Sequence, residues 1–263
     1  MDHLLYHLDA SGIAWLTFNR PDSRNATSID MLEALHGHLL RIDGNSAVRC
    51  VVLRGAGAHF MAGADLAALD EISGLPPAER RIAIQQRLAR SAPVFSLIER
   101  LRQPVLASVR GAAAGGGLSF VLASDLAIAA NDAKFLLAQV KVGLAPDGGS
   151  TWHMQRSIGM KQAKQLALLG EPIDASTALA WGIVNWVVAP DAIEAETARI
   201  ARLLAAGATE SLAQAKQLLN LASGNGLAEQ VSLESRGLGL CAQSDDFPEG
   251  IRAARNKRAP TFQ

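Results

Sequence analysis

The chain has few cysteines, no excess of charge of either sign and no signature of disorder. Its two cysteines, Cys50 and Cys241, form no CxxC pair, so the usual zinc and redox motifs are missing. Both lie among apolar residues, and we expect buried, free thiols. The 25 basic and 25 acidic side chains cancel, which argues against a nucleic-acid partner held by phosphate contacts. A hydrophobic content of 49% in 263 residues excludes a disordered chain.

Long hydrophobic runs are also missing. No 18 consecutive apolar residues occur, so we expect no membrane span and no membrane partner. Met1-Asp2-His3 lacks the basic start and apolar run of a signal peptide. The last four residues carry no lipidation or targeting signal. These absences predict a cytoplasmic location.

The pattern of apolar residues changes near residue 150. Before it, segments with the pattern of strands alternate with segments whose apolar residues have helical spacing. The strand patterns lie at 4–8, 13–18, 48–53, 105–109, 126–130 and 135–138, and the helical spacing lies at 31–42 and 76–102. After it, helices are expected at 160–169, 175–181, 190–206, 209–223, 227–243 and 246–256, with one strand at 184–188. Pro93 should kink or interrupt the long helix. The order predicts an α/β core with a helical appendage.

Two turns with small residues carry the clearest signal for chemistry. The first, HFMAGADL at 59–66, and the second, GAAAGGG at 111–117, each follow a predicted strand and precede an apolar segment that can begin a helix. Helix N-termini present unpaired N–H groups. Facing each other, the turns could direct two N–H donors at one thioester oxygen that becomes an enolate, which is an oxyanion hole. Taken alone, both could equally be tight structural turns.

Other motifs are absent or weak. Neither turn has GxGxxG spacing, no GxxxxGK[ST] occurs, and Gly149-Ser150 does not form a GxSxG nucleophile elbow. The six histidines are scattered, so we expect no metal site. Asp125 is interpreted as structural. Phe95 and Trp152 could line an apolar pocket or simply belong to the core.

Six short motifs follow one another along the chain. They are NRPDSRNA at 19–26, FMAGADL at 60–66, GAAAGGGL at 111–118, GLAPDGGST at 143–151, ALAWGIVNWVV at 178–188 and FPEGIRAARNKRAPTF at 247–262. Each motif is weak evidence by itself. Together, in this order and over nearly the whole chain, they resemble the crotonase superfamily, the enoyl-CoA hydratase/isomerase family.

The resemblance implies a fold, a substrate class and an assembly. The fold would be α/β, a crotonase-like spiral of ββα units. Residues 1–195 would form the core with the CoA and acyl pocket, and residues 196–263 a helical oligomerisation region. That region would build a homotrimer, often paired into a dimer of trimers. The ligand would be an acyl-CoA thioester, with no cofactor beyond its coenzyme A moiety.

The resemblance also implies roles for individual residues. Ala64 matches the first oxyanion N–H donor and Gly116 the second. Lys257 matches a basic residue that can approach the CoA phosphates of a neighbouring subunit. Arg24 and Lys257 could equally be solvated surface charges, although phosphate prefers basic partners. The positions assigned to substrate and CoA binding are Arg24, Ala26, Ala62, Asp65, Leu66 and Lys257.

Two departures from the family pattern bear on the reaction. Hydratases of the family use two glutamates around a water, at positions where this chain has Ser119 and Gln139. Water addition needs a base for the water and an acid for carbon. A hydroxyl and an amide cannot supply that pair at neutral pH.

One carboxylate lies in a promising place, in Pro146-Asp147-Gly148-Gly149. Some members of the family, among them isomerases and aryl-CoA dehalogenases, use an aspartate at this position. Double-bond migration needs a single base that removes a proton and returns it to another carbon. The alternative interpretation is that Asp147 forms an Asx turn or caps the next helix.

The sequence thus predicts an enzyme that isomerises the double bond or a ring of an acyl-CoA. Ala64 and Gly116 would hold the enolate oxygen and Asp147 would move the proton. Two alternatives stay open: an enoyl-CoA hydratase with a noncanonical acid and base, and a family member that binds acyl-CoA without turnover.

Overall fold

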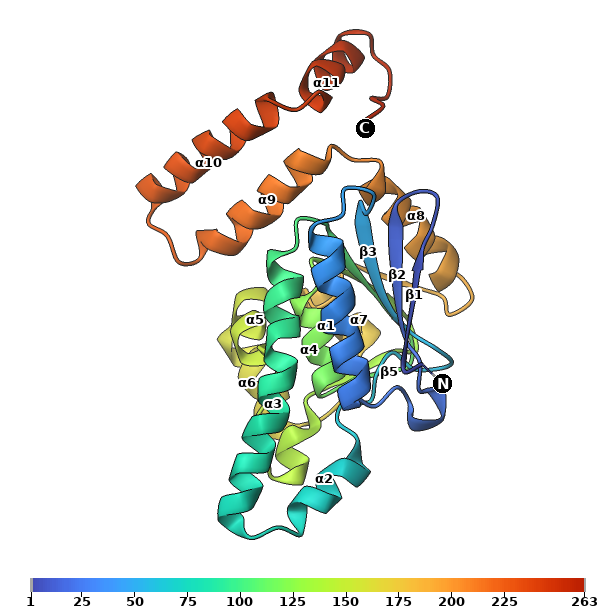
Figure 1. The fold of residues 1–263 in the computed structure, drawn as a ribbon, viewed down its shortest axis with the longest axis vertical. Coiled ribbons are helices and arrows are strands. Elements are labelled where there is room, and N and C mark those ends of the chain that lie inside the picture. The colour runs from blue at the N-terminus through green and yellow to red at the C-terminus, as the bar shows by residue number, and fades with distance from the viewer. Residues whose placement is uncertain (1, 263) are drawn as a thin grey trace.

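A six-stranded sheet forms the centre of the computed structural model, which describes residues 2–262 (Figure 1). Its order is β1-β2-β3-β4-β6-β9; β1 and β2 pair antiparallel and the other neighbours pair parallel. The strands are β1 Leu4–Leu8, β2 Ile13–Phe18, β3 Cys50–Gly55, β4 Val105–Val109, β6 Leu126–Ala130 and β9 Trp186–Val188. A second sheet joins β5 Ala112–Ala114, β7 Lys134–Leu136 and β8 Ile173–Asp174. The predicted α/β class is confirmed.

Alternate residues of the buried strands face two separate cores. Val51 and Leu53 of β3 belong to the larger core, which includes residues of α1, α3 and α4. Cys50 and Val52 face the smaller core with α8. This alternation follows from the two-residue period of a strand. The helices concerned are α1 Ile29–Asp43, α3 Pro77–Arg100, α4 Gly116–Ala123 and α8 Ile193–Ala205.

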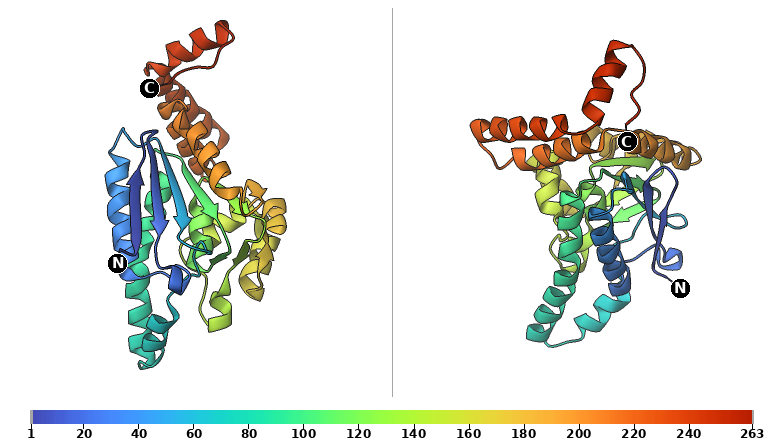
Figure 2. Two further views of the ribbon diagram at one scale, coloured as in Figure 1. Left: turned by 90° about the vertical axis from the view of Figure 1, so that its right-hand side faces the viewer. Right: turned by 45° about the horizontal axis from the view of Figure 1, so that its top comes forward.

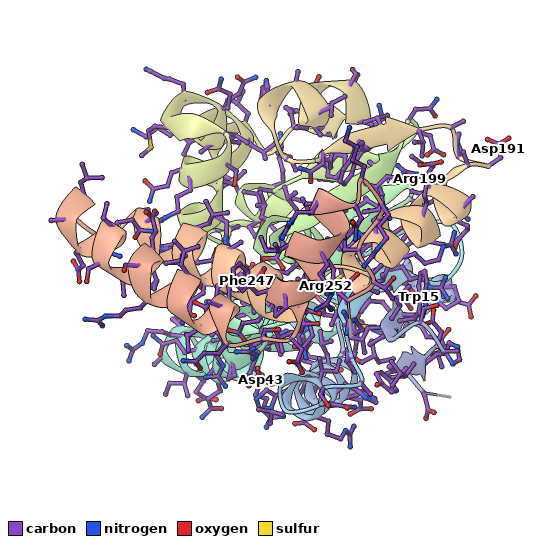
Figure 3. The ribbon with its side chains drawn as sticks, turned by 90° about the horizontal axis from the view of Figure 1, so that it is seen from above. Trp15, Asp43, Asp191, Arg199, Phe247 and Arg252 are labelled. Atoms are coloured by element: carbon purple, nitrogen blue, oxygen red, sulfur yellow. The ribbon has the colours of Figure 1, made fainter. Side chains whose placement is uncertain are left out.

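The C-terminal helices lie at one end of the molecule. Figure 2 shows α10 and α11 projecting beyond α9 and away from the sheet. Seen from above, Phe247 and Arg252 of α11 lie over the body of the protein (Figure 3). The predicted boundary at residue 195 falls within α8, whose Ile200 and Ala201 pack on the sheet. The remaining helices are α2 Leu66–Ser73, α5 Ser150–Ser157, α6 Gly159–Leu169, α7 Ala175–Trp181, α9 Thr209–Ala222, α10 Leu227–Ala242 and α11 Asp246–Arg255.

Most predicted elements are present, with informative exceptions. Helix α3 runs through Pro93, so of the two expected effects, a kink or an interruption, the interruption does not occur. Ala89, whose carbonyl would have accepted a bond from residue 93, is exposed and can be hydrated instead. The strand expected at 135–138 ends at Leu136, because residues 138–142 form the short 3-10 helix η2 (Ala138–Val142).

The two cysteines are free, but their environments differ. Cys50 is buried, and burial raises the pKa of its thiol to about 12. Cys241 is half-buried, so the prediction that both are buried is wrong for this residue. Within residues 2–262, no helix has the length and hydrophobicity that crossing a membrane requires.

Candidate active site

The two turns singled out in the sequence lie side by side. The first follows β3 and the second follows β4, which are parallel neighbours, so both turns leave the same edge of the sheet. Met61 donates its N–H to Ala112 O at 2.9 Å, and Ala114 donates to Met61 O at 2.9 Å. Phe60 donates to Arg110 O at 2.7 Å. Three backbone hydrogen bonds therefore hold the turns in register.

Glycine is required where the turns touch. A Cβ at Gly63 would lie 2.8 Å from Ala114 O, and one at Gly117 would lie 2.4 Å from Met61 O. Both separations are far below a normal contact. Gly63 also has φ +91°, which disfavours other residues. The close packing of the turns therefore depends on these residues having no side chain.

The N–H groups of Ala64 and Gly116 have no acceptor among the described residues, and the orientation of each peptide plane determines where its N–H points. The Gly63 carbonyl accepts from Thr27 N at 2.8 Å and from Thr27 Oγ1 at 3.2 Å. In a trans peptide the following N–H points the opposite way, so the Ala64 N–H points away from Thr27. The Gly116 N–H opens helix α4. Neither N–H has an acceptor among residues 2–262, and both residues line one pocket.

Asp147 lies in the same pocket, in the segment between η2 and α5. It is half-buried. The next two residues, Gly148 and Gly149, have φ +61° and +72°. A Cβ at Gly148 would lie 2.7 Å from the ring of Phe95 and 2.8 Å from Ser119 Cβ. The paired glycines thus allow the backbone after Asp147 to pass close to α3 and α4.

The residues at the two family glutamate positions both bind Asp147. Gln139 Nε2 donates to Asp147 Oδ1 at 2.9 Å, and Ser119 Oγ donates to the Asp147 backbone carbonyl at 3.1 Å. Ser119 is fully buried in α4. Gln139 Oε1 is buried without a hydrogen-bond partner among the described residues. These side chains therefore hold Asp147 beside the two turns.

The interpretation of Asp147 as a helix cap is wrong. The N-cap of α5 is Gly149, and no side chain caps this helix. The carboxylate is directed to Gln139 instead, because two residues of positive φ separate Asp147 from the first turn of α5.

The pocket has a volume of about 690 Å³, within the range of small-molecule sites. Five of the positions assigned to CoA line it: Arg24, Ala26, Ala62, Asp65 and Leu66. Lys257, which follows α11, is not among the lining residues.

Sequence reasoning missed the role of Arg20 and the contacts of Asn25. Arg20 Nη2 binds Asp65 Oδ2 at 2.9 Å, and this hydrogen bond lowers the pKa of the Asp65 carboxyl. Asp65 also caps α2 by accepting from Ala67 N. The fully buried Asn25 donates to the carbonyls of Ala56, His59 and Phe60. Arg20 and Asn25 both lie in the NRPDSRNA motif at 19–26, which is the sequence feature that could have indicated their roles.

The deeper wall of the pocket is apolar. Phe95 stacks on Phe120 with ring centroids 4.7 Å apart, and both line the pocket. Leu32, Leu69, Ile84 and Leu88 also line it. Trp152 does not line it: the ring is partly exposed and lies under the guanidinium of Arg156. The suggestion that Trp152 walls the pocket is therefore wrong for this chain, whereas Phe95 does so.

Comparisons with known proteins agree with this geometry. The family model described as "Enoyl-CoA hydratase/isomerase" matches residues 9–263. The 1,2-epoxyphenylacetyl-CoA isomerase of Escherichia coli K12 is 36% identical over 263 residues, covering 100% of this chain and 98% of the relative. The crotonyl-CoA hydratase of Syntrophomonas wolfei is 32% identical, covering 95% and 94%. The crystal structure of an enoyl-CoA hydratase from Polaromonas sp. JS666 superposes with a TM-score of 0.91 at 32% identity, covering 99% of both chains.

This chain therefore belongs to the enoyl-CoA hydratase/isomerase family and has the crotonase fold. It is an enzyme of that family, and its substrates belong to the acyl-CoA class.

Proposed function

We propose that the protein isomerises unsaturated acyl-CoA thioesters by moving a double bond, or a strained ring, with Asp147 as the only acid–base group. The observation that carries this proposal is the hydrogen-bonded arrangement of Asp147, Gln139 and Ser119 beside the two turns. The pocket has a carboxylate for one proton transfer. It has no second carboxylate at either position that the family's hydratases use.

The reaction follows from these groups. The thioester oxygen accepts hydrogen bonds from the Ala64 and Gly116 N–H groups. Asp147 removes a proton from C2 of a 3-enoyl-CoA, and the electrons move into a dienolate whose charge lies on the thioester oxygen. Asp147 then returns the same proton to C4, which leaves a 2-enoyl-CoA. This reaction requires no water, no redox change and no cofactor beyond the CoA moiety.

Gln139 and Ser119 act on Asp147 rather than on the substrate. The Gln139 amide fixes one carboxylate oxygen and leaves the other free for the proton. The Ser119 hydroxyl fixes the backbone at the same residue. A base that is held in place transfers a proton more effectively than one that must be oriented first.

The apolar side chains of the C-terminal helices support the proposed assembly. Leu219, Leu227 and Leu238 are more than 70% exposed in the single chain, and large exposed apolar patches mark interaction surfaces. We propose a homotrimer or a dimer of trimers, with Lys257 of one subunit near the CoA phosphates of the next. Light scattering that shows a stable monomer at micromolar concentration would refute it. The proposed location is cytoplasmic.

The experiment compares two reactions of one preparation. Turnover of 3-hexenoyl-CoA to the 2-enoyl product measures isomerisation, and water addition to crotonyl-CoA measures hydration. We expect isomerisation to exceed hydration by about 100-fold or more, because hydration lacks one of its two acid–base groups. Hydration as fast as isomerisation would favour the noncanonical hydratase, and tight binding with neither reaction would favour the non-catalytic alternative.

A further inference from the structure

One face of α3 lines the pocket, and a single charged residue interrupts it. Ile84, Leu88, Ser91 and Phe95 are spaced so that they share this face. Arg87 lies between them and also lines the pocket. At its far end, the face reaches the Phe95 ring, next to the glycines that follow Asp147. The acyl compartment thus has a cation in an otherwise largely apolar wall.

The guanidinium of Arg87 is held in place but not neutralised. Arg87 Nη2 donates to Thr27 O at 3.2 Å. No carboxylate among residues 2–262 forms an ion pair with it. A guanidinium has five N–H donors, so most of them have no protein acceptor in the described part of the chain. The residue is half-buried, and leaving a charge without a partner in such a place is unfavourable.

The other cations that line the pocket differ from Arg87. Lys141 forms an ion pair with Glu171 at 2.6 Å. Arg24 is exposed, and the resemblance assigns it to CoA binding. Arg87 is the one half-buried cation lining the pocket that lacks a carboxylate partner among the described residues.

The hydrogen bond from Arg87 to the Thr27 carbonyl places the guanidinium near the reacting end of the pocket. Thr27, whose carbonyl holds the guanidinium, donates twice to the Gly63 carbonyl, and the next residue is Ala64. A rigid planar guanidinium matches a carboxylate through two parallel hydrogen bonds.

We propose that Arg87 binds a carboxylate on the acyl group, so that the preferred substrates are carboxyacyl-CoA esters. This inference rests on the proposed function for the identity of the pocket as the acyl-CoA site. A CoA phosphate is the rival source of negative charge. Arg87 extends from the apolar acyl wall, and this favours the acyl carboxylate.

The test measures binding without turnover, using saturated esters. Dissociation constants are measured for succinyl-, glutaryl- and adipyl-CoA, for butyryl-, pentanoyl- and hexanoyl-CoA, and for CoA itself. The quantity compared is the ratio of Kd for the methyl-ended ester to Kd for the carboxylated ester of equal length. We expect Arg87→Met to lower this ratio at least tenfold at one or more lengths, because a hydrogen-bonded charge pair contributes about 10–100-fold in affinity. Affinity for CoA should change less than threefold.

Arg90→Met is the matched control. Arg90 lies one turn further along α3, is exposed, and meets Glu33 at 3.8 Å, so its removal should leave the ratio unchanged. Arg87→Lys is a second variant, made in case Arg87→Met fails to fold. It keeps the charge but loses the planar geometry, so we expect a smaller fall in the Kd ratio. The proposal is overturned if the ratio falls less than tenfold at every length. It is also overturned if Arg87→Met weakens CoA and all esters alike, which would indicate a phosphate contact. Failure of isomerisation alone would refute the proposed function and leave these binding ratios intact.

Discussion

Replacing Gln139 by glutamate should weaken Asp147 as a base through charge alone. The amide nitrogen lies 2.9 Å from Asp147 Oδ1, so Gln139→Glu places a second carboxylate oxygen at that distance. Two unit charges 2.9 Å apart repel by about 6 kcal/mol at an effective dielectric constant of about 20. This is an upper bound, because both side chains are only half-buried.

The repulsion makes the two carboxyls share one proton at neutral pH. Because the proton is divided between the two carboxyls, Asp147 is ionised only part of the time, and isomerisation at pH 7 should fall by about twofold or more. Raising the pH removes the shared proton, so the variant should recover activity at alkaline pH. The initial rate of 3-hexenoyl-CoA isomerisation across this pH range is the assay.

Gln139→Met is the control for this variant. It removes the hydrogen bond without adding charge, so its pH profile should show no recovery at alkaline pH. The reasoning is refuted if Gln139→Glu keeps the wild-type rate at pH 7 with an unchanged pH profile.

Two further predictions concern stability. Burial, reinforced by Arg156, lowers the pKa of His153 from 6.5 to about 4; the unfolded chain therefore binds a proton that the folded chain does not. The free energy of unfolding should fall by up to about 3 kcal/mol as the pH drops from 6.5 towards 4, and His153→Gln should flatten this dependence in urea titrations. An equally steep fall in the variant would exclude His153 as its cause. Lys216 Nζ binds Asp125 Oδ2 at 2.7 Å and the carbonyls of Ile98 and Gln103, so Lys216→Met should cost about 2–4 kcal/mol by leaving that carboxylate unpaired. The exposed Lys164→Met is its control, and a loss no larger than the control's would contradict this estimate.

Local patterns in the sequence were sufficient to predict much of the fold. Short apolar runs marked the buried strands, and Ser28, a residue type favoured at the N-cap, caps α1 by accepting from Met31 N. Helix α5 was missed because its sequence, STWHMQRS, has only two apolar residues, Trp152 and Met154, which are too few to define a helical period.

Contacts between distant segments could not be predicted from local patterns. The Arg20–Asp65 pair joins residues 45 positions apart, and the lack of a carboxylate partner for Arg87 among residues 2–262 depends on where α3 packs. The Gln139–Asp147 bond joins η2 to the segment before α5, whose geometry depends on glycines of positive φ. The identity of the site residues could be proposed from sequence, but the contacts that orient Asp147 required the three-dimensional structure.

The central claim is that Asp147 moves the proton, and Asp147→Asn tests it most directly. The amide keeps the shape of the side chain but cannot accept and return a proton. Single-turnover isomerisation of 3-hexenoyl-CoA should fall by about 10²–10⁴-fold, with affinity for the saturated hexanoyl-CoA nearly unchanged. A variant that keeps more than about a tenth of the wild-type rate falls outside that range and would contradict the assignment of Asp147 as the catalytic base.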